Sequence, residues 1–107
     1  MTADPCADAP IACSLDAGAL GERIEEWRAL VASSVVSVDA EPTAVHLVLD
    51  PSDAALVAAV GLAQREKQCC PFFGVAVDIG AESRTLSLCV PDGAEEVLAT
   101  FVAALRS

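Results

Sequence analysis

The segment that most constrains the fold is Gln64–Gly74, in which two adjacent cysteines are followed directly by a proline. Proline cannot donate the backbone hydrogen bond that continues a helix, and it disfavours the helical conformation in the residue before it. A helix arriving from upstream is therefore predicted to end at about Cys70. Adjacent cysteines rarely bond to each other, because the small ring strains both the disulfide and the peptide. We therefore interpret Cys69 and Cys70 as a reduced pair at a helix end.

The length and the apolar content of the chain predict one folded domain. It has 107 residues, of which 54% are apolar, and this is enough for a single hydrophobic core. The first ten residues hold two prolines and two aspartates and show no apolar periodicity. We expect residues 1–10 to be a mobile N-terminal arm and residues 11–107 to form a single α+β domain.

Apolar periodicity predicts alternating helices and hairpins along the domain. Ile11–Leu15 is predicted to be a short strand, followed by a helix whose apolar stripe is Leu20, Ile24, Trp27 and Val31. Two hairpins are predicted, at 34–39 with 44–49 and at 75–79 with 85–90. The last helix is expected to begin at a capping box of Asp92 and Glu95, with a core stripe of Val97, Leu98, Phe101, Val102 and Leu105. The order β-α-β-β-α-β-β-α predicts an α+β sandwich with a mostly antiparallel sheet covered by helices.

The second helix is predicted to run from an Asp50 cap, with Pro51 in its first turn, to Cys70. Its expected buried stripe is Leu56, Ala59, Val60, Ala63 and Cys70. Cys69 is turned toward the edge of this stripe, and Glu66 lies three residues before Cys69 and four before Cys70. At that helical spacing the carboxylate projects over the same region as both thiols.

The charge of the chain excludes several classes of partner. Six Lys and Arg residues against 16 Asp and Glu residues give a net charge of −10, which repels nucleic acid and anionic membranes. The chain lacks an apolar run long enough to cross a bilayer, and its N-terminus lacks the features of a secretory signal. We therefore expect a cytoplasmic protein, and the apolar excess favours a homodimer.

Five cysteines are many for a short intracellular chain, and an odd number fits no closed disulfide framework. In a reducing compartment they indicate metal binding or thiol chemistry. Cys13, Cys69 and Cys70 could hold Hg(II) or Cu(I), which need only two or three sulfurs. Zinc would require a fourth ligand, for which Glu66, His46 and Cys89 are the candidates.

Several of these residues also carry a resemblance to a known group of proteins. With Ala12-Cys13-Ser14-Leu15 near its start and Glu66-x-x-Cys69-Cys70-Pro71-Phe72-Phe73 at its centre, the chain resembles small bacterial proteins that share a Cys-Cys-Pro-Phe motif. Similar segments accompany mercury-responsive and related regulators. The resemblance implies metal or metalloid chemistry and carries over Cys13, Glu66, Cys69 and Cys70. It offers no counterpart for Cys6 or Cys89.

Three functions are therefore open from the sequence. The first is binding of a thiophilic metal ion of the mercury, copper or zinc class through Cys13, Cys69, Cys70 and Glu66, for sequestration, transfer or sensing. The second is a thiol-dependent enzyme or redox protein that uses Cys69 or Cys70. The negative end of the helix dipole and the Glu66 carboxylate disfavour the thiolate that such chemistry needs, and the positive charges of Arg65 and Lys67 could offset them. The sole histidine, His46, lies in another element, so the sequence shows no Cys-His pair. The third is a structural or partner-binding domain with inert core cysteines, which binds a partner or a small apolar ligand. No motif indicates an organic cofactor or assigns a catalytic residue.

Overall fold

The computed structural model describes residues 17–106, so the predicted arm over residues 1–10 and the predicted strand Ile11–Leu15 lie outside the described residues. The order of elements in the described part is α-β-β-α-β-β-α. The elements are α1 (Ala17–Ser34), β1 (Val35–Glu41), β2 (Ala44–Leu49), α2 (Asp53–Cys69), β3 (Gly74–Ile79), β4 (Arg84–Cys89) and α3 (Glu95–Arg106). No helix in residues 17–106 is long and apolar enough to cross a membrane.

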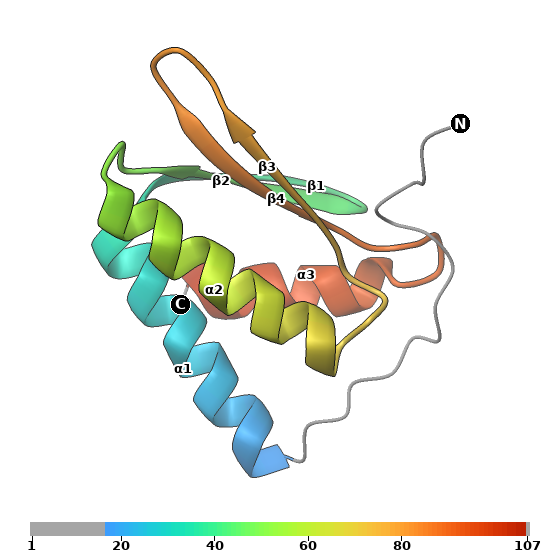
Figure 1. The fold of residues 1–107 in the computed structure, drawn as a ribbon. Coiled ribbons are helices and arrows are strands. Elements are labelled where there is room, and N and C mark those ends of the chain that lie inside the picture. The colour runs from blue at the N-terminus through green and yellow to red at the C-terminus, as the bar shows by residue number, and fades with distance from the viewer. Residues whose placement is uncertain (1–16, 107) are drawn as a thin grey trace.

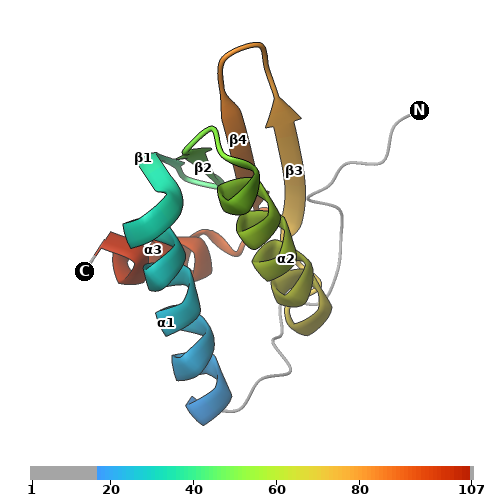
Figure 2. The ribbon, with the colours of Figure 1, turned by 60° about the vertical axis from the view of Figure 1, so that its left-hand side comes forward.

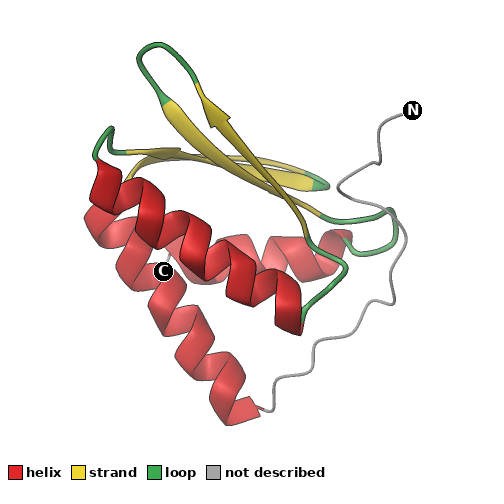
Figure 3. Cartoon of the chain, in the orientation of Figure 1, coloured by secondary structure: helices red, strands yellow, loops and turns green. Residues whose placement is uncertain are grey.

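The four strands form one antiparallel sheet with the order β1-β2-β4-β3 (Figure 1). Each hairpin supplies two neighbouring strands, and the pairing of β2 with β4 joins the hairpins at the centre of the sheet. Within the described part of the chain all three helices lie on one face of this sheet (Figure 3), and α1 and α2 run beside each other in both ribbon views (Figure 2). The predicted α+β class and the antiparallel, helix-covered sheet are confirmed.

The core lies between the sheet and the helices because the two central strands alternate apolar and polar side chains. Val45, Leu47 and Leu49 of β2 and Leu86 and Leu88 of β4 are at most 2% exposed. The helices contribute Trp27 and Phe101, whose rings meet edge to face with centroids 5.4 Å apart. In both central strands, alternate side chains are therefore buried against the helices.

The start of α2 differs from the prediction by two residues. The N-cap is Ser52, whose side-chain oxygen accepts a hydrogen bond from the backbone N–H of Ala55 at 3.1 Å, so the prediction of Asp50 as the cap is wrong. A serine at this position satisfies an otherwise unpaired backbone donor of the first turn. The end of α2 agrees within one residue, since Cys69 is the last helical residue and Cys70 the C-cap.

The buried stripe of α2 is rotated from the one predicted. Val60 is 41% exposed, whereas Glu66 is only 3% exposed and belongs to the buried side with Ala59, Leu62 and Ala63. Hydrophobicity alone places valine inside and glutamate outside. The reverse is observed because α1 supplies polar partners for the buried carboxylate.

The last helix also begins differently from the predicted capping box. Glu95 is the first helical residue, and its carboxylate accepts a hydrogen bond from the backbone N–H of Gly93 at 2.7 Å. Gly93 has a φ of +99°, a conformation that glycine adopts without steric cost. Of the predicted stripe of α3, Leu98, Phe101, Val102 and Leu105 are buried, whereas Val97 is 39% exposed.

The burial of Leu47 yields a test of the core. Leu47 has no exposed surface, so Leu47→Ala removes buried methyl groups and leaves a cavity, and we expect a loss of about 2–5 kcal/mol in the free energy of unfolding. Val57→Ala on α2 is the control, since Val57 is 70% exposed and the change should stay within about 0.5 kcal/mol. Urea unfolding followed by circular dichroism measures both. Equal effects in the two variants would contradict the assignment of the core.

Candidate functional site

Glu66 is the buried acidic residue around which the polar contacts between α1 and α2 gather. Its carboxylate projects from α2 toward α1, where the indole N–H of Trp27 donates a hydrogen bond to Glu66 Oε1 at 2.7 Å. Trp27 is fully buried. Burying a charged carboxylate is costly unless hydrogen bonds and an opposite charge compensate it. Trp27 provides the hydrogen bond, and Arg23 provides the charge.

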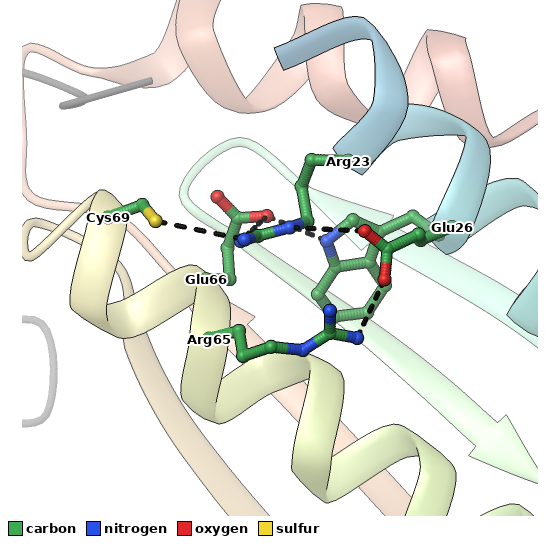
Figure 4. A network of polar contacts seen from close by, with 6 residues as sticks. Arg23, Glu26, Arg65, Glu66 and Cys69 are labelled. Atoms are coloured by element: carbon green, nitrogen blue, oxygen red, sulfur yellow. Dashed lines mark hydrogen bonds and ion pairs between the residues drawn. The ribbon is translucent and has the colours of Figure 1, made fainter. Parts of the chain in front are cut away.

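Arg23 lies one turn before Trp27 on α1 and contacts three groups (Figure 4). Its Nη1 lies 3.7 Å from Glu66 Oε1, and its Nε lies 3.8 Å from Glu26 Oε1. Its Nη2 donates to the sulfur of Cys69 at 3.7 Å. Arg23 is 8% exposed, so its guanidinium is held between the helices, and its third contact is with a thiol.

Two further charges extend this network to the surface. Arg65 Nη2 of α2 lies 2.7 Å from Glu26 Oε2, so Glu26 is shared between two arginines on different helices. Two cations and two carboxylates therefore balance beside Cys69. Arg23 Nε and Nη1 are within ion-pair range of carboxylates but have no hydrogen-bond partner in the described part of the chain. The guanidinium is thus positioned mainly by charge, and its directed hydrogen bond goes to sulfur.

The cysteines of the described residues are in two chemical states. Cys69 is a free, half-buried thiol, whereas Cys70 is 3% exposed and disulfide-bonded, as is Cys89. The expectation that Cys69 and Cys70 do not bond to each other is confirmed, but their interpretation as a reduced pair is wrong for Cys70. Cys89, a candidate fourth ligand for zinc, is likewise in a disulfide. Successive side chains on a helix diverge by about 100°, so one sulfur faces α1 while the next enters the core.

The structure brings two of the four predicted metal ligands together. Glu66 and Cys69 meet through Arg23, a cation that occupies the place between them. Cys70 is in a disulfide, and Cys13, like Cys6, lies outside the described residues. Within residues 17–106 no three His, Cys, Asp or Glu side chains are grouped as metal ligands. Binding of a thiophilic metal ion therefore stays a prediction.

A second polar cluster lies on the face of the sheet that points away from the core. His46 Nδ1 is 2.7 Å from Ser87 Oγ, and His46 Nε2 is 2.6 Å from Glu41 Oε2. The register of the sheet places His46 directly opposite Ser87. His46 faces away from the core, and its two ring nitrogens are hydrogen-bonded. The cluster is separated from the thiol by the sheet and the core.

Sequence reasoning missed the two residues of α1 that organise the site. Trp27 was assigned to the core for its apolar ring, and its N–H was given no partner. Arg23 was not singled out, and the cations expected near the thiols were Arg65 and Lys67. Arg65 instead pairs with Glu26, and Lys67 donates to the backbone oxygen of Pro71. The usable signal was the spacing of Arg23 and Trp27, four residues apart on one helical face.

Comparison of the chain with protein-family models, curated proteins and solved structures finds no match.

The buried pair of Arg23 and Glu66 yields a prediction about stability. Removing one partner leaves the other charge buried without compensation, so Arg23→Met and Glu66→Gln should each lower the free energy of unfolding by about 3 kcal/mol. Their side chains are only 10% and 4% exposed. The double variant should lose less than the sum of the two losses, by about 1 kcal/mol or more. Urea unfolding of the three variants measures this coupling, and strictly additive losses would contradict the pairing.

Proposed function

We propose that the protein is a thiol-exchange protein in which Cys69 is the reacting sulfur and low-molecular-weight disulfides are the substrate class. The observation that carries this proposal is the hydrogen bond from Arg23 Nη2 to Cys69 Sγ. It corresponds to the thiol-dependent alternative derived from the sequence, which the helix dipole and Glu66 were expected to oppose and Arg65 and Lys67 to offset. Arg23, on the neighbouring helix, is the cation that contacts the sulfur.

Charge at the site supports this chemistry. The thiolate is the nucleophilic form of cysteine, and reactive cysteines lie beside cations in partly exposed surroundings. Glu66 was expected to oppose negative charge on the sulfur, but its carboxylate is engaged by Trp27 and Arg23. A hydrogen bond from a guanidinium to an anion is stronger than one between neutral groups. Arg23 therefore stabilises the negative charge on sulfur, and Glu66 and Glu26 hold Arg23 in place.

The exchange conserves electrons at each step. The Cys69 thiolate attacks one sulfur of an external disulfide, a bond forms between the two sulfurs, and the other half of the substrate leaves as a thiolate that takes up a proton. A second external thiol then attacks the mixed disulfide and regenerates Cys69. Small thiols of the cytoplasm, the location expected from the sequence, would supply this second step. The half-buried position of Cys69 favours small substrates over proteins.

Soft-metal binding, the first hypothesis from the sequence, would use the same sulfur. A two-coordinate ion needs a second thiolate, and Cys70 is disulfide-bonded. Reduction would have to precede binding. Titration with Hg(II) in the presence of a competing small thiol, before and after reduction of the protein, separates the two functions. Thiol exchange predicts reaction at Cys69 without prior reduction, whereas metal retention that appears only after reduction supports the metal site.

The rate of disulfide exchange tests the role of Arg23. In the unreduced protein, Cys69 should react with a chromogenic aromatic disulfide, and Cys69→Ala should abolish this reaction. Arg23→Gln should slow it about tenfold, since a hydrogen bond to a charged group is lost. Arg65→Gln is the matched control, because Arg65 belongs to the same network but binds Glu26, and its rate should be unchanged.

Retention of the fold is checked by circular dichroism for each variant. Should Arg23→Gln unfold, Arg23→Lys keeps the charge without the planar donor group and should give an intermediate rate. A folded Arg23→Gln protein that reacts at the wild-type rate would contradict the proposal. So would reaction that persists in Cys69→Ala.

A further inference from the structure

An apolar cavity lies between α1, the end of α2 and α3, beside the polar network. Its volume is about 490 Å³. Six large apolar side chains from three parts of the chain line it: Leu20, Ile24, Phe72, Phe73, Val97 and Phe101. Cavities of this size accept small organic molecules. Leu20 and Val97, predicted to be core residues, are 42% and 39% exposed because they border this space.

One acceptor atom in the wall of this cavity has no partner. Glu66 lines the cavity, is 3% exposed, and uses only Oε1 in its contacts with Trp27 and Arg23. In Figure 4 the dashed lines at Glu66 reach one carboxylate oxygen, and the second oxygen, Oε2, has none. Within residues 17–106, the side-chain N and O atoms that have neither accessible surface nor a hydrogen-bond partner are both on Arg23. Glu66 Oε2 is not one of them, so it keeps some accessible surface. The cavity is the space that Glu66 lines.

The charges around the cavity determine the kind of group that would meet this acceptor. The negative charge of Glu66 is compensated by Arg23, and that of Glu26 by Arg65. Glu96, which also lines the cavity, forms no ion pair within residues 17–106. Among these charged residues, Glu96 thus carries the one negative charge without an ion-pair partner in the described part of the chain. A ligand with a single positive charge balances it, and a carboxylate or phosphate is repelled.

We propose that this cavity binds a small apolar molecule that carries one primary or secondary ammonium group. The ammonium N–H donates to Glu66 Oε2, an acceptor that is otherwise unpartnered. The apolar part of the ligand packs among Phe72, Phe73 and Phe101, whose rings lie close to one another, with centroids 4.8 Å apart for the first two and 5.5 Å for the last two. The aromatic faces add a favourable interaction with the cation. This binding does not depend on the thiol exchange, because Cys69 does not line the cavity.

Three probes with a common apolar part test the proposal. They are 4-phenylbutylamine, its N,N,N-trimethylammonium derivative and 4-phenylbutanoate. All three fill the cavity, but only the first offers a cation with N–H donors. We expect the amine to bind about tenfold tighter than the trimethylammonium compound, because the latter cannot donate to Oε2, and the carboxylate not to bind. The dissociation constants are measured by isothermal titration calorimetry.

The indole N–H of Trp27 reports the site of binding. Trp27 is the only tryptophan, and its N–H is bonded to the other oxygen of the same carboxylate. Its single side-chain signal in a ¹H–¹⁵N correlation spectrum should shift on titration with the amine. A trimethylammonium compound that binds as tightly as the amine, or a saturating amine that leaves this signal in place, would overturn the proposal.

Variants of the cavity wall complete the test. Glu66→Gln removes the charge but also weakens the pairing with Arg23, so a second variant is needed. Val97→Trp changes a residue at the border of the cavity that is 39% exposed, and it should fill the space and abolish amine binding. Val57→Trp, at a 70% exposed site on α2 that does not line the cavity, is the matched control and should bind as the wild type does. Undiminished binding in a folded Val97→Trp protein would place the amine elsewhere and contradict the proposal.

Discussion

The hydrogen bond between Trp27 and Glu66 is the interaction on which the arrangement of α1 and α2 depends. It buries a carboxylate at 3% exposure against a fully buried indole, in the part of the core where the two helices meet. Because water is excluded around such a buried carboxylate, an opposite charge must compensate it. Arg23 meets this requirement from one turn away on the same helix as Trp27. The position of Arg23 follows from the burial of Glu66, and the contact of Arg23 with Cys69 follows from that position.

The two oxygens of Glu66 divide the site into two chemical environments. Oε1 accepts a hydrogen bond from Trp27 and pairs with Arg23, and the guanidinium of Arg23 donates a hydrogen bond to the free thiol of Cys69. Oε2 takes no part in these contacts of the described residues, and Glu66 lines an apolar cavity. One buried carboxylate thereby supports two proposals with separate tests, since the thiol does not line the cavity. Both proposals follow from the same physical requirement, that buried polar atoms find partners.

The adjacent cysteines differ because helical geometry separates neighbours in the chain. Cys69 turns toward α1 and receives a hydrogen bond from Arg23, while Cys70 enters the core and is disulfide-bonded. A two-sulfur site built from this pair would need both sulfurs on one side, which the angle of about 100° between successive side chains opposes. The motif is therefore better described as one free, half-buried sulfur and one disulfide-bonded sulfur than as a chelating pair.

The sequence by itself determined the features that depend on neighbours along the chain. The helix end before Pro71 and the two hairpins were predicted because backbone conformation and alternation are local properties. It did not determine that Glu66 is buried and Val60 exposed, or that Arg23 reaches Cys69. These outcomes depend on which side of α2 faces α1, and that orientation is set by contacts between residues about 40 positions apart. Only the tertiary structure decides whether a polar side chain has a partner that makes its burial favourable.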